Sequence, residues 1–200
     1  ALMASLSAVA SAQVTLGAGF LSGKDYYKGA KNINGNETLR GFYVGADYKL
    51  TLVGGFGIAP AVYFEFLTDP NAFYYAIPNA SCRHTEMAVN IPINLNYSFD
   101  FGTMVLSLYG GPNLQIGCSN KYNANVLGVS KTWDLYKVNS ELGNDRYNRF
   151  DVLLGGGATI DVARVIRINA GYYHGVINRI ASKTGSINRG QFHIGLAYIF

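Results

Sequence analysis

The chain has 200 residues, of which 49% are hydrophobic and only 14% are charged, and this length suits a single domain. No run of eighteen consecutive apolar residues occurs, which excludes a membrane-spanning helix and leaves strands as the means of crossing a bilayer. The net charge of +4 and the pI near 9.0 do not indicate a nucleic-acid partner by themselves, because the position of charges matters more than their sum.

The first segment, Ala1–Ala12, is apolar and rich in small residues, and it ends in the A-x-A pattern of a signal-peptidase site. We interpret residues 1–12 as the C-terminal part of a signal peptide whose charged start is missing. A short buried helix is the alternative, although such small residues fill a core poorly. Export is therefore predicted, with a mature barrel domain at residues 13–200.

Alternation of apolar and polar residues predicts eight strands along the rest of the chain. The pattern is clearest from Met87 to Phe99, where odd positions are apolar and even positions are mostly polar. The 24 glycines, 15 tyrosines and 11 phenylalanines also favour sheet over helix. The predicted strands span residues 13–20, 42–52, 57–68, 86–98, 103–116, 150–162, 165–177 and 191–200.

The connections between these strands alternate in length. Short turns are predicted at Val53–Phe56, Phe99–Gly102 and Ala163–Arg164, and long polar loops at 21–41, 69–85, 117–149 and 178–190. This asymmetry is typical of outer-membrane barrels, with short periplasmic turns and long extracellular loops. We therefore predict an all-β, eight-stranded antiparallel up-and-down transmembrane β-barrel with both termini periplasmic. The third loop leaves room for an extended hairpin through Lys131–Val138.

The polarity of the two strand faces separates this barrel from a soluble lipocalin-like one, which keeps its apolar face inside. The apolar face holds no Asp, Glu, Lys or Arg, whereas the polar face includes Asp47, Lys49, Glu65, Asp151, Asp161 and Arg167. The lipid face is predicted to include Val44, Val89, Ile91, Ile93, Leu106, Leu108, Leu154 and Ile168. Aromatic residues at both ends of the strands predict two interfacial girdles.

Two pairings follow from the predicted turns. A turn at 163–165 places Asp161 opposite Arg167, which predicts a salt bridge in the lumen. Folding the hairpin about Asp100–Phe101 brings position 82 opposite about 119, and export takes both thiols to an oxidising compartment. A disulfide between Cys82 and Cys118 is therefore predicted, although their face parity is out of register unless a bulge near Gly110-Gly111 or the freedom of the loops above the strands corrects it.

Thirteen of the sixteen Lys and Arg residues fall in the predicted long loops. This distribution favours contact with phosphate-rich lipopolysaccharide, and a merely solvated loop surface is the alternative. No nucleic-acid partner is predicted.

No catalytic residue, metal site or cofactor is predicted. The three histidines, His84, His174 and His193, lie in different segments without the spacing of a metal site. The sequence His84-Thr85-Glu86 offers a base and a carboxylate but no evident nucleophile. Gly155-Gly156-Gly157 lacks the Lys and Ser or Thr of a phosphate loop, which indicates a structural role.

From Gln13 to Phe200 the sequence resembles the small outer-membrane barrel family of OmpX and the OmpA transmembrane domain, in particular its "porin family" branch. The resemblance rests on MAVNIPINLNYSF at Met87–Phe99, LYGGPNLQI at Leu108–Ile116, the strands in 150–177 and the terminal GQFHIGLAYIF. It implies that the alternating residues of the last strand form the signal that the barrel-assembly machinery reads. These residues are Phe192, Ile194, Leu196, Tyr198 and Phe200.

The expected function is that of a non-enzymatic surface protein whose loops serve structural, adhesive or recognition roles, because side chains fill the interior of an eight-stranded barrel. Two alternatives stay open: a narrow pore or small-ligand carrier, and a lipid A-modifying enzyme such as the deacylase PagL, whose His-x-Ser element is absent here. The sequence does not identify an extracellular partner.

Overall fold

The computed structural model describes residues 11–28, 37–52, 54–72, 80–126, 128–138, 146–181 and 185–200. These residues form nine antiparallel strands and no helix long and apolar enough to cross a membrane. The strands are β1 (Ser11–Lys28), β2 (Glu37–Thr51), β3 (Phe56–Asp69), β4 (Ala80–Asp100), β5 (Met104–Val126), β6 (Val129–Asp134), β7 (Phe150–Val162), β8 (Ile166–Gly175) and β9 (Ser186–Ile199).

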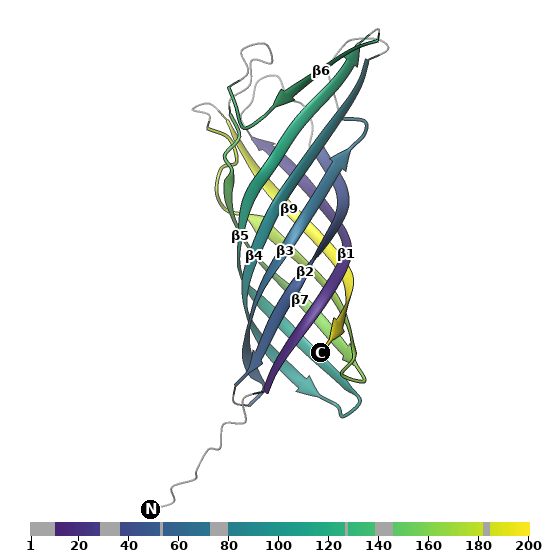
Figure 1. Cartoon of the computed structure of the whole chain (residues 1–200). Helices are drawn as coiled ribbons and strands as arrows, with labels where there is room; N and C mark the ends of the chain where they lie inside the picture. The colour runs from purple at the N-terminus through teal and green to yellow at the C-terminus, as the bar shows by residue number, and fades with distance from the viewer. Residues whose placement is uncertain are drawn as a thin grey trace, which may run out of the picture.

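Eight of the strands close into a barrel (Figure 1). They follow the order β4, β3, β2, β1, β9, β8, β7 and β5, and the pairing of β4 with β5 closes the ring. The predicted fold class is thereby confirmed. The ninth strand, β6, pairs only with the outer part of β5, from Lys121 to Val126, within the segment where the long loop left room for a hairpin.

The alternation of residues along the strands places apolar side chains on the outside of the barrel and charged side chains inside, the reverse of a soluble barrel. All eight residues predicted to face lipid are exposed or partly exposed, including Val44, Leu108 and Leu154 at about half of their full area. The charged residues Lys49 and Glu65, in contrast, are buried in the interior. The outer surface therefore suits hydrocarbon, and the lumen holds the charge.

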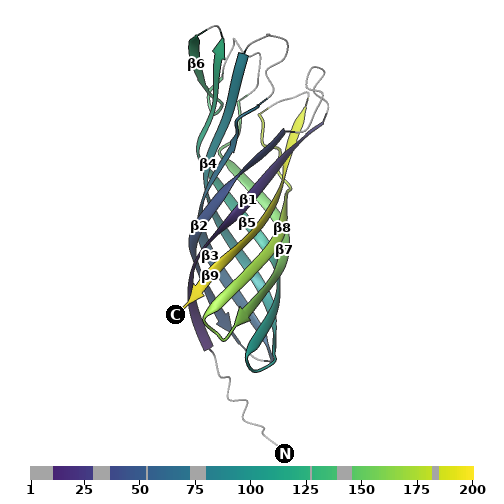
Figure 2. The ribbon, with the colours of Figure 1, turned by 90° about the vertical axis from the view of Figure 1, so that its right-hand side faces the viewer.

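The two ends of the barrel differ (Figures 1 and 2). At one end, which we name the turn end, the short connections lie close to the predicted places, and both Ser11 and Phe200 lie there. At the other, the loop end, much of the predicted loop is strand: β1 continues to Lys28 and β5 to Val126. Alternation did not reveal these extensions because they rise beyond the apolar surface, where both faces of a strand can be polar.

Aromatic side chains border the apolar belt at both ends. Phe42 stacks on Phe66 with ring centroids 5.5 Å apart at the loop end, and Phe56 meets Tyr97 at 4.7 Å at the turn end. Residues beyond the loop-end girdle lie outside the membrane-spanning segments. This girdle consists of Phe20, Phe42, Phe66, Phe150 and Phe192.

The structure corrects the predicted disulfide. The turn lies later than expected, at residues 101–103, so Cys82 pairs with Ala124 rather than with a residue near 119. Cys118 is the extra residue of a β-bulge, because Met87 pairs with Ser119 while its neighbour Ala88 pairs with Gly117. Cys82 is buried, Cys118 is exposed and both are free. Six residues of strand separate Cys118 from the partner of Cys82, about 20 Å.

The residues predicted as a signal peptide lie mostly outside the described residues. Ser11 and Ala12, which the prediction assigned to the signal peptide, belong to β1 in the structure. The strand begins at Ser11, and Ala12 pairs with Leu50 of β2. Export and the boundary at Gln13 stay predictions.

Candidate functional site

The lumen holds three polar layers, and the layer nearest the turn end surrounds Arg167. Its guanidinium lies opposite Asp161, with 2.6 Å between Nε and Oδ1 and 2.9 Å between Nη2 and Oδ2. Nη1 also donates to Asp47 Oδ1 at 2.7 Å. Lys49 Nζ lies 3.9 Å from Asp161 Oδ2 and donates to Ser107 at 2.7 Å. The two residues of the predicted salt bridge therefore lie side by side, within a larger network.

The Asp161–Arg167 pair should show strong coupling in a double-mutant cycle. Arg167→Gln leaves the buried Asp161 without its bidentate partner, so we expect the double variant with Asp161→Asn to be more stable than the sum of the single effects predicts. The expected coupling is about 0.5–3 kcal/mol in the free energy of unfolding, measured by urea titration in lipid vesicles. Additive single effects would contradict the pairing.

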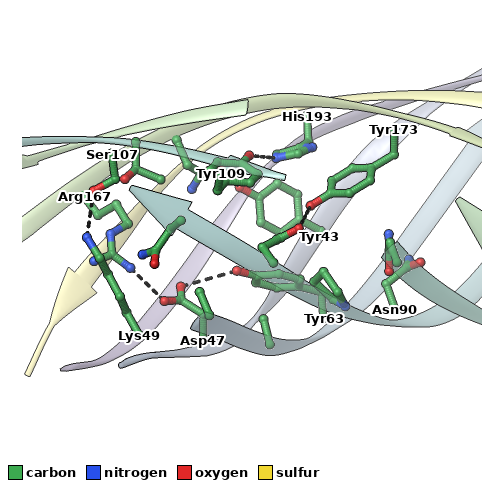
Figure 3. A pocket seen from close by; sticks show the side chains of 18 of the residues that line it. Tyr43, Asp47, Lys49, Tyr63, Asn90, Ser107, Tyr109, Arg167, Tyr173 and His193 are labelled. Carbon is green, nitrogen blue, oxygen red and sulfur yellow. Dashed lines mark hydrogen bonds and ion pairs between the residues drawn. The ribbon is translucent and has the colours of Figure 1, made fainter. Parts of the chain in front are cut away.

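The middle layer is a chamber of about 90 Å³ (Figure 3). Four tyrosines and His193 line it, and their polar atoms are bonded within the barrel: Tyr43 donates to Asn169 at 2.7 Å and Tyr173 to Asn94 at 2.8 Å. The Tyr109 hydroxyl lies 2.9 Å from His193 Nε2. Asn94 faces inward because even positions of β4 point into the lumen. Asp47, Lys49 and Arg167 of the first layer also line the chamber, so it reaches the ion pairs of the turn end and has a polar and aromatic lining.

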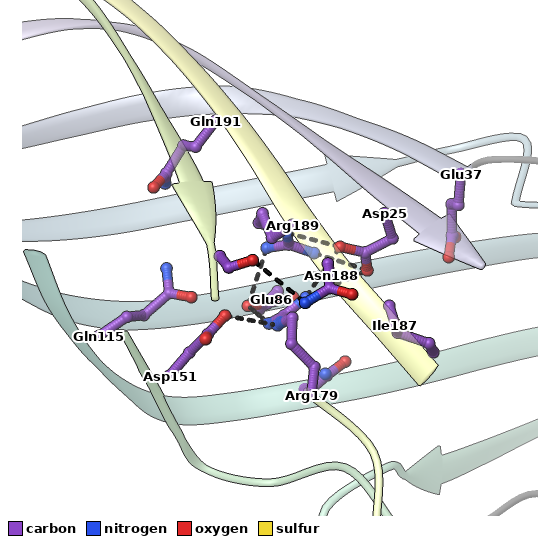
Figure 4. A network of polar contacts seen from close by, with 12 residues as sticks. Asp25, Glu37, Glu86, Gln115, Asp151, Arg179, Ile187, Asn188, Arg189 and Gln191 are labelled. Atoms are coloured by element: carbon purple, nitrogen blue, oxygen red, sulfur yellow. Dashed lines mark hydrogen bonds and ion pairs between the residues drawn. The ribbon is translucent and has the colours of Figure 1, made fainter. Parts of the chain in front are cut away.

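The third layer closes the loop end with two arginines and three carboxylates (Figure 4). Arg189 of β9 binds Asp25 in bidentate fashion, at 2.7 and 2.9 Å, and its Nη1 lies 3.0 Å from Glu86. Arg179, from the connection between β8 and β9, binds Asp25 at 3.0 Å and Glu86 at 2.5 Å, and lies 3.5 Å from Asp151. All five are buried, so this layer, the Arg179–Arg189 network, obstructs the lumen.

Burial of Asp25 favours its neutral form, but Arg189 and Arg179 outweigh this effect and hold the pKa of its carboxyl at about 2. Asp25 is therefore charged at neutral pH. The network combines two positive and three negative side chains, with a formal charge of −1.

A histidine cluster lies beside this network, beyond the loop-end girdle. His84 Nδ1 is 2.8 Å from Glu37 Oε1, and Nε2 is 2.6 Å from Asn120 Oδ1. The ring stacks on Tyr122 at 4.4 Å, and the Tyr122 hydroxyl donates to Glu37 at 2.7 Å. Burial opposes protonation of His84, but its hydrogen bond with Glu37 and the charges of Glu37 and Glu86 outweigh this and raise the pKa.

A family model for the outer membrane protein beta-barrel domain matches residues 8–181. The chain belongs to this family. Among solved structures, Ail, the attachment invasion locus protein of Yersinia pestis, is similar with a TM-score of 0.52 and 14% identity, over 94% of this chain and 98% of Ail. Neisserial surface protein A has a TM-score of 0.49 and 15% identity, over 96% of this chain and 99% of its own. No curated protein sequence matches the chain.

As a member of this family, the chain is an outer-membrane barrel. The free energy of unfolding of this barrel should depend on pH through His84. A raised histidine pKa stabilises the fold below the unfolded value of about 6.5, and this gain is lost as pH rises through the folded value. We therefore expect the free energy of unfolding to fall as pH rises above about 6.5. Urea titrations between about pH 5 and 9 measure this fall, which Glu37→Gln should reduce and His174→Asn should leave unchanged. An unchanged slope in Glu37→Gln would contradict the role of this pair.

The other two histidines of this barrel lie apart from His84. His193 faces the chamber beside Tyr109, and His174 faces outward with its ring 6.0 Å from that of Tyr26. The ring nitrogens of His84 contact Glu37 and Asn120, so neither nitrogen is paired with a hydroxyl or a thiol. Over the described ranges, no group of three or more His, Cys, Asp or Glu residues could hold a metal ion.

The predicted assembly-signal residues are the even positions from Phe192 to Phe200. The first four lie in β9 and Phe200 follows it, and all five face outward. Their reading by the assembly machinery stays a prediction.

Sequence reasoning missed the Arg179–Arg189 network and placed its arginines in an outward loop. For Arg189 a signal existed, since it continues the inward alternation of Gln191 and His193. Asp25 likewise continues the inward odd positions of β1. Arg179 lies outside any strand, so no periodicity could have found it.

Proposed function

We propose that this barrel is a non-enzymatic surface protein that holds its loop end outside the cell as a recognition or adhesive surface. The observation that carries the proposal is the extension of β4 and β5 beyond the loop-end girdle, where β6 joins them in a three-stranded sheet (Figure 1). Paired strands thus present this part of the surface.

The outer face of this sheet is polar. Arg83 of β4, Lys121 and Asn123 of β5 and Thr132 of β6 line one shallow groove. In this proposal both termini are periplasmic, because short turns face the periplasm in barrels of this kind. The groove then lies on the extracellular side, above the lipid headgroups.

The obstructed lumen supports a surface role over that of a pore. Two layers of buried ion pairs cross the interior, at Arg167 and at Arg179 with Arg189. Refolded protein in a planar bilayer should therefore show no sustained porin-like conductance. Steady open channels in the wild type would favour the pore alternative instead.

The distribution of charge outside the belt supports lipopolysaccharide as the neighbouring partner. Nine cationic side chains of the described residues beyond the loop-end girdle are exposed or partly exposed, and two of them, Lys131 and Lys137, lie on β6 and just after it. Asp25, Glu37 and Glu86, in contrast, are turned into the lumen. Phosphates at headgroup level would meet this basic collar. The collar consists of the other seven, which are Lys24, Lys28, Arg40, Arg83, Lys121, Arg146 and Arg149.

A binding experiment tests the surface role. Cells displaying the wild type should adhere to polyanionic surfaces, and purified protein should bind lipopolysaccharide and sucrose octasulfate, the heparin analogue present in one Ail structure. The double variant Arg83→Ser with Lys121→Ser should bind each more weakly. Arg164→Ser, at the exposed turn end, is the matched control. Equal binding by all three proteins would contradict the proposed surface, and altered lipid A in mass spectra of the expressing cells would favour an enzyme.

A further inference from the structure

Glu65 is a buried carboxylate without an ion pair among the described residues. It projects from β3 into the chamber, and 6% of its surface is exposed. Its Oε2 accepts bonds from Gln191 Nε2 at 2.6 Å and from Gln115 Nε2 at 3.3 Å. The buried carboxylates Asp25 and Asp161, in contrast, each contact an arginine. A charge buried this way costs free energy unless a cation offsets it or the carboxyl takes up a proton.

The amides around Glu65 have oxygen atoms that lack a hydrogen-bond partner. They are Gln191 Oε1, Gln115 Oε1 and Asn90 Oδ1, each on a side chain that is at most 2% exposed. Asn90 pairs with Gln115 across β4 and β5, and the register of β3 with β4 places Asn90 diagonally from Glu65. Gln191 and Asn90 both line the chamber. Three unpaired amide oxygens therefore belong to side chains that adjoin a carboxylate which accepts only amide N–H groups, and Asn90 Nδ2 is unpaired as well.

We infer that the chamber binds a small monovalent cation beside Glu65, held by this carboxylate and by the amide oxygens of Asn90, Gln115 and Gln191. Oxygen ligands suit hard cations, and a single uncompensated carboxylate matches one positive charge. A divalent ion would need further carboxylates, and the nearby ones belong to the Arg179–Arg189 network.

The size of the chamber agrees with this ligand. About 90 Å³ holds a bare ion with a few waters, since one water needs roughly 10–15 Å³ by this measure. The Arg179–Arg189 network lies on the loop-end side of this site, and on the turn-end side Lys49 and Arg167, which line the chamber, are paired with Asp161. This inference does not depend on the proposed surface function.

Thermal unfolding in different chlorides tests the inference. Refolded protein in neutral detergent is heated at constant ionic strength in sodium, potassium, rubidium or N-methylglucamine chloride. We expect the best-fitting ion to raise the unfolding midpoint by about 5 °C over N-methylglucamine, which is too large for the chamber. Equal midpoints in all four salts would overturn the proposal and leave water as the content of the chamber.

Two variants assign the effect to Glu65. Glu65→Gln should unfold at the same temperature in every salt, whereas Asp100→Asn, which removes an exposed carboxylate at the turn end, should keep the wild-type dependence. An unchanged dependence in Glu65→Gln would refute the assignment.

A second measurement needs no variant, in case Glu65→Gln fails to fold. Wild-type crystals grown in rubidium chloride should show an anomalous peak in the chamber within ligand distance of Glu65. No peak there, in data whose anomalous signal reveals rubidium ions at other ordered sites, would overturn the inference.

Discussion

Replacing Arg189 with glutamine should destabilise the barrel by about 3–5 kcal/mol, the usual cost of removing one partner from a buried ion pair. Arg189 is fully buried and makes a bidentate pair with Asp25 as well as a 3.0 Å contact with Glu86. Glutamine cannot offset either charge, so Asp25 and Glu86, together with Asp151, would be left with Arg179 as the one arginine of the network. The free energy of unfolding in urea, measured on protein folded into lipid vesicles, checks this value.

Two comparisons separate this effect from a general loss of arginine. Arg164→Gln removes an ion pair with Asp100 at 2.8 Å, but both side chains are more than half exposed, so the cost should stay below about 1 kcal/mol. The double variant of Arg189→Gln with Asp25→Asn should recover part of the loss, because the buried negative charge has also gone. If Arg189→Gln and Arg164→Gln cost the same, the network does not stabilise the loop end as described.

The sequence predicted the eight-stranded ring because one physical constraint acts along the whole membrane-spanning part. Lipid on one side and a polar lumen on the other impose a period of two, which Val44 and Leu108 follow on the outside and Lys49 on the inside. The Asp161–Arg167 pairing was accessible for the same reason, since a short turn fixes the register of its two strands.

Outside the membrane this constraint does not act. The predictions of strand ends and of the disulfide fail there, beyond the loop-end girdle. In the outer half of β5, Tyr122 and Ala124 alternate with Lys121 and Asn123, but the apolar side faces inward and the polar side outward, so the lipid-facing pattern of a membrane strand is missing. The disulfide failed because register errors accumulate from the turn: a turn a few residues late and a bulge at Cys118 together place Cys82 opposite Ala124. Neither feature has a signal in the alternation.

The sequence revealed only part of the candidate site, because some of its residues lie outside the predicted strands. The charges of the lumen were found wherever they fell within a predicted strand, as with Glu65 and Asp151. Arg179 reaches the network from a connection, and its partners come from β1, β4 and β7, which are far apart in the sequence. Such a contact depends on tertiary structure alone.

Placing arginine at Leu108 should cost about 2–4 kcal/mol in the free energy of folding into vesicles, the range for a cation at the bilayer midplane on the lipid face of a barrel. Leu108 faces outward from β5 and is 51% exposed, between the outward residues Met104 and Ile116 that border the belt on this strand. Its charge would therefore lie in hydrocarbon, with neither headgroups nor lumen within easy reach. Urea titration of Leu108→Arg against the wild type measures the cost.

Controls on the same strand separate burial in lipid from the loss of a leucine. Leu108→Ala removes the side chain without adding charge and should cost clearly less than Leu108→Arg. Asn123→Arg adds the same charge on the outward face of β5, but at a position beyond the girdle, so its cost should be close to zero. Equal costs at positions 108 and 123 would mean that Leu108 does not face lipid, and the outward assignment of the apolar face of β5 would then be wrong.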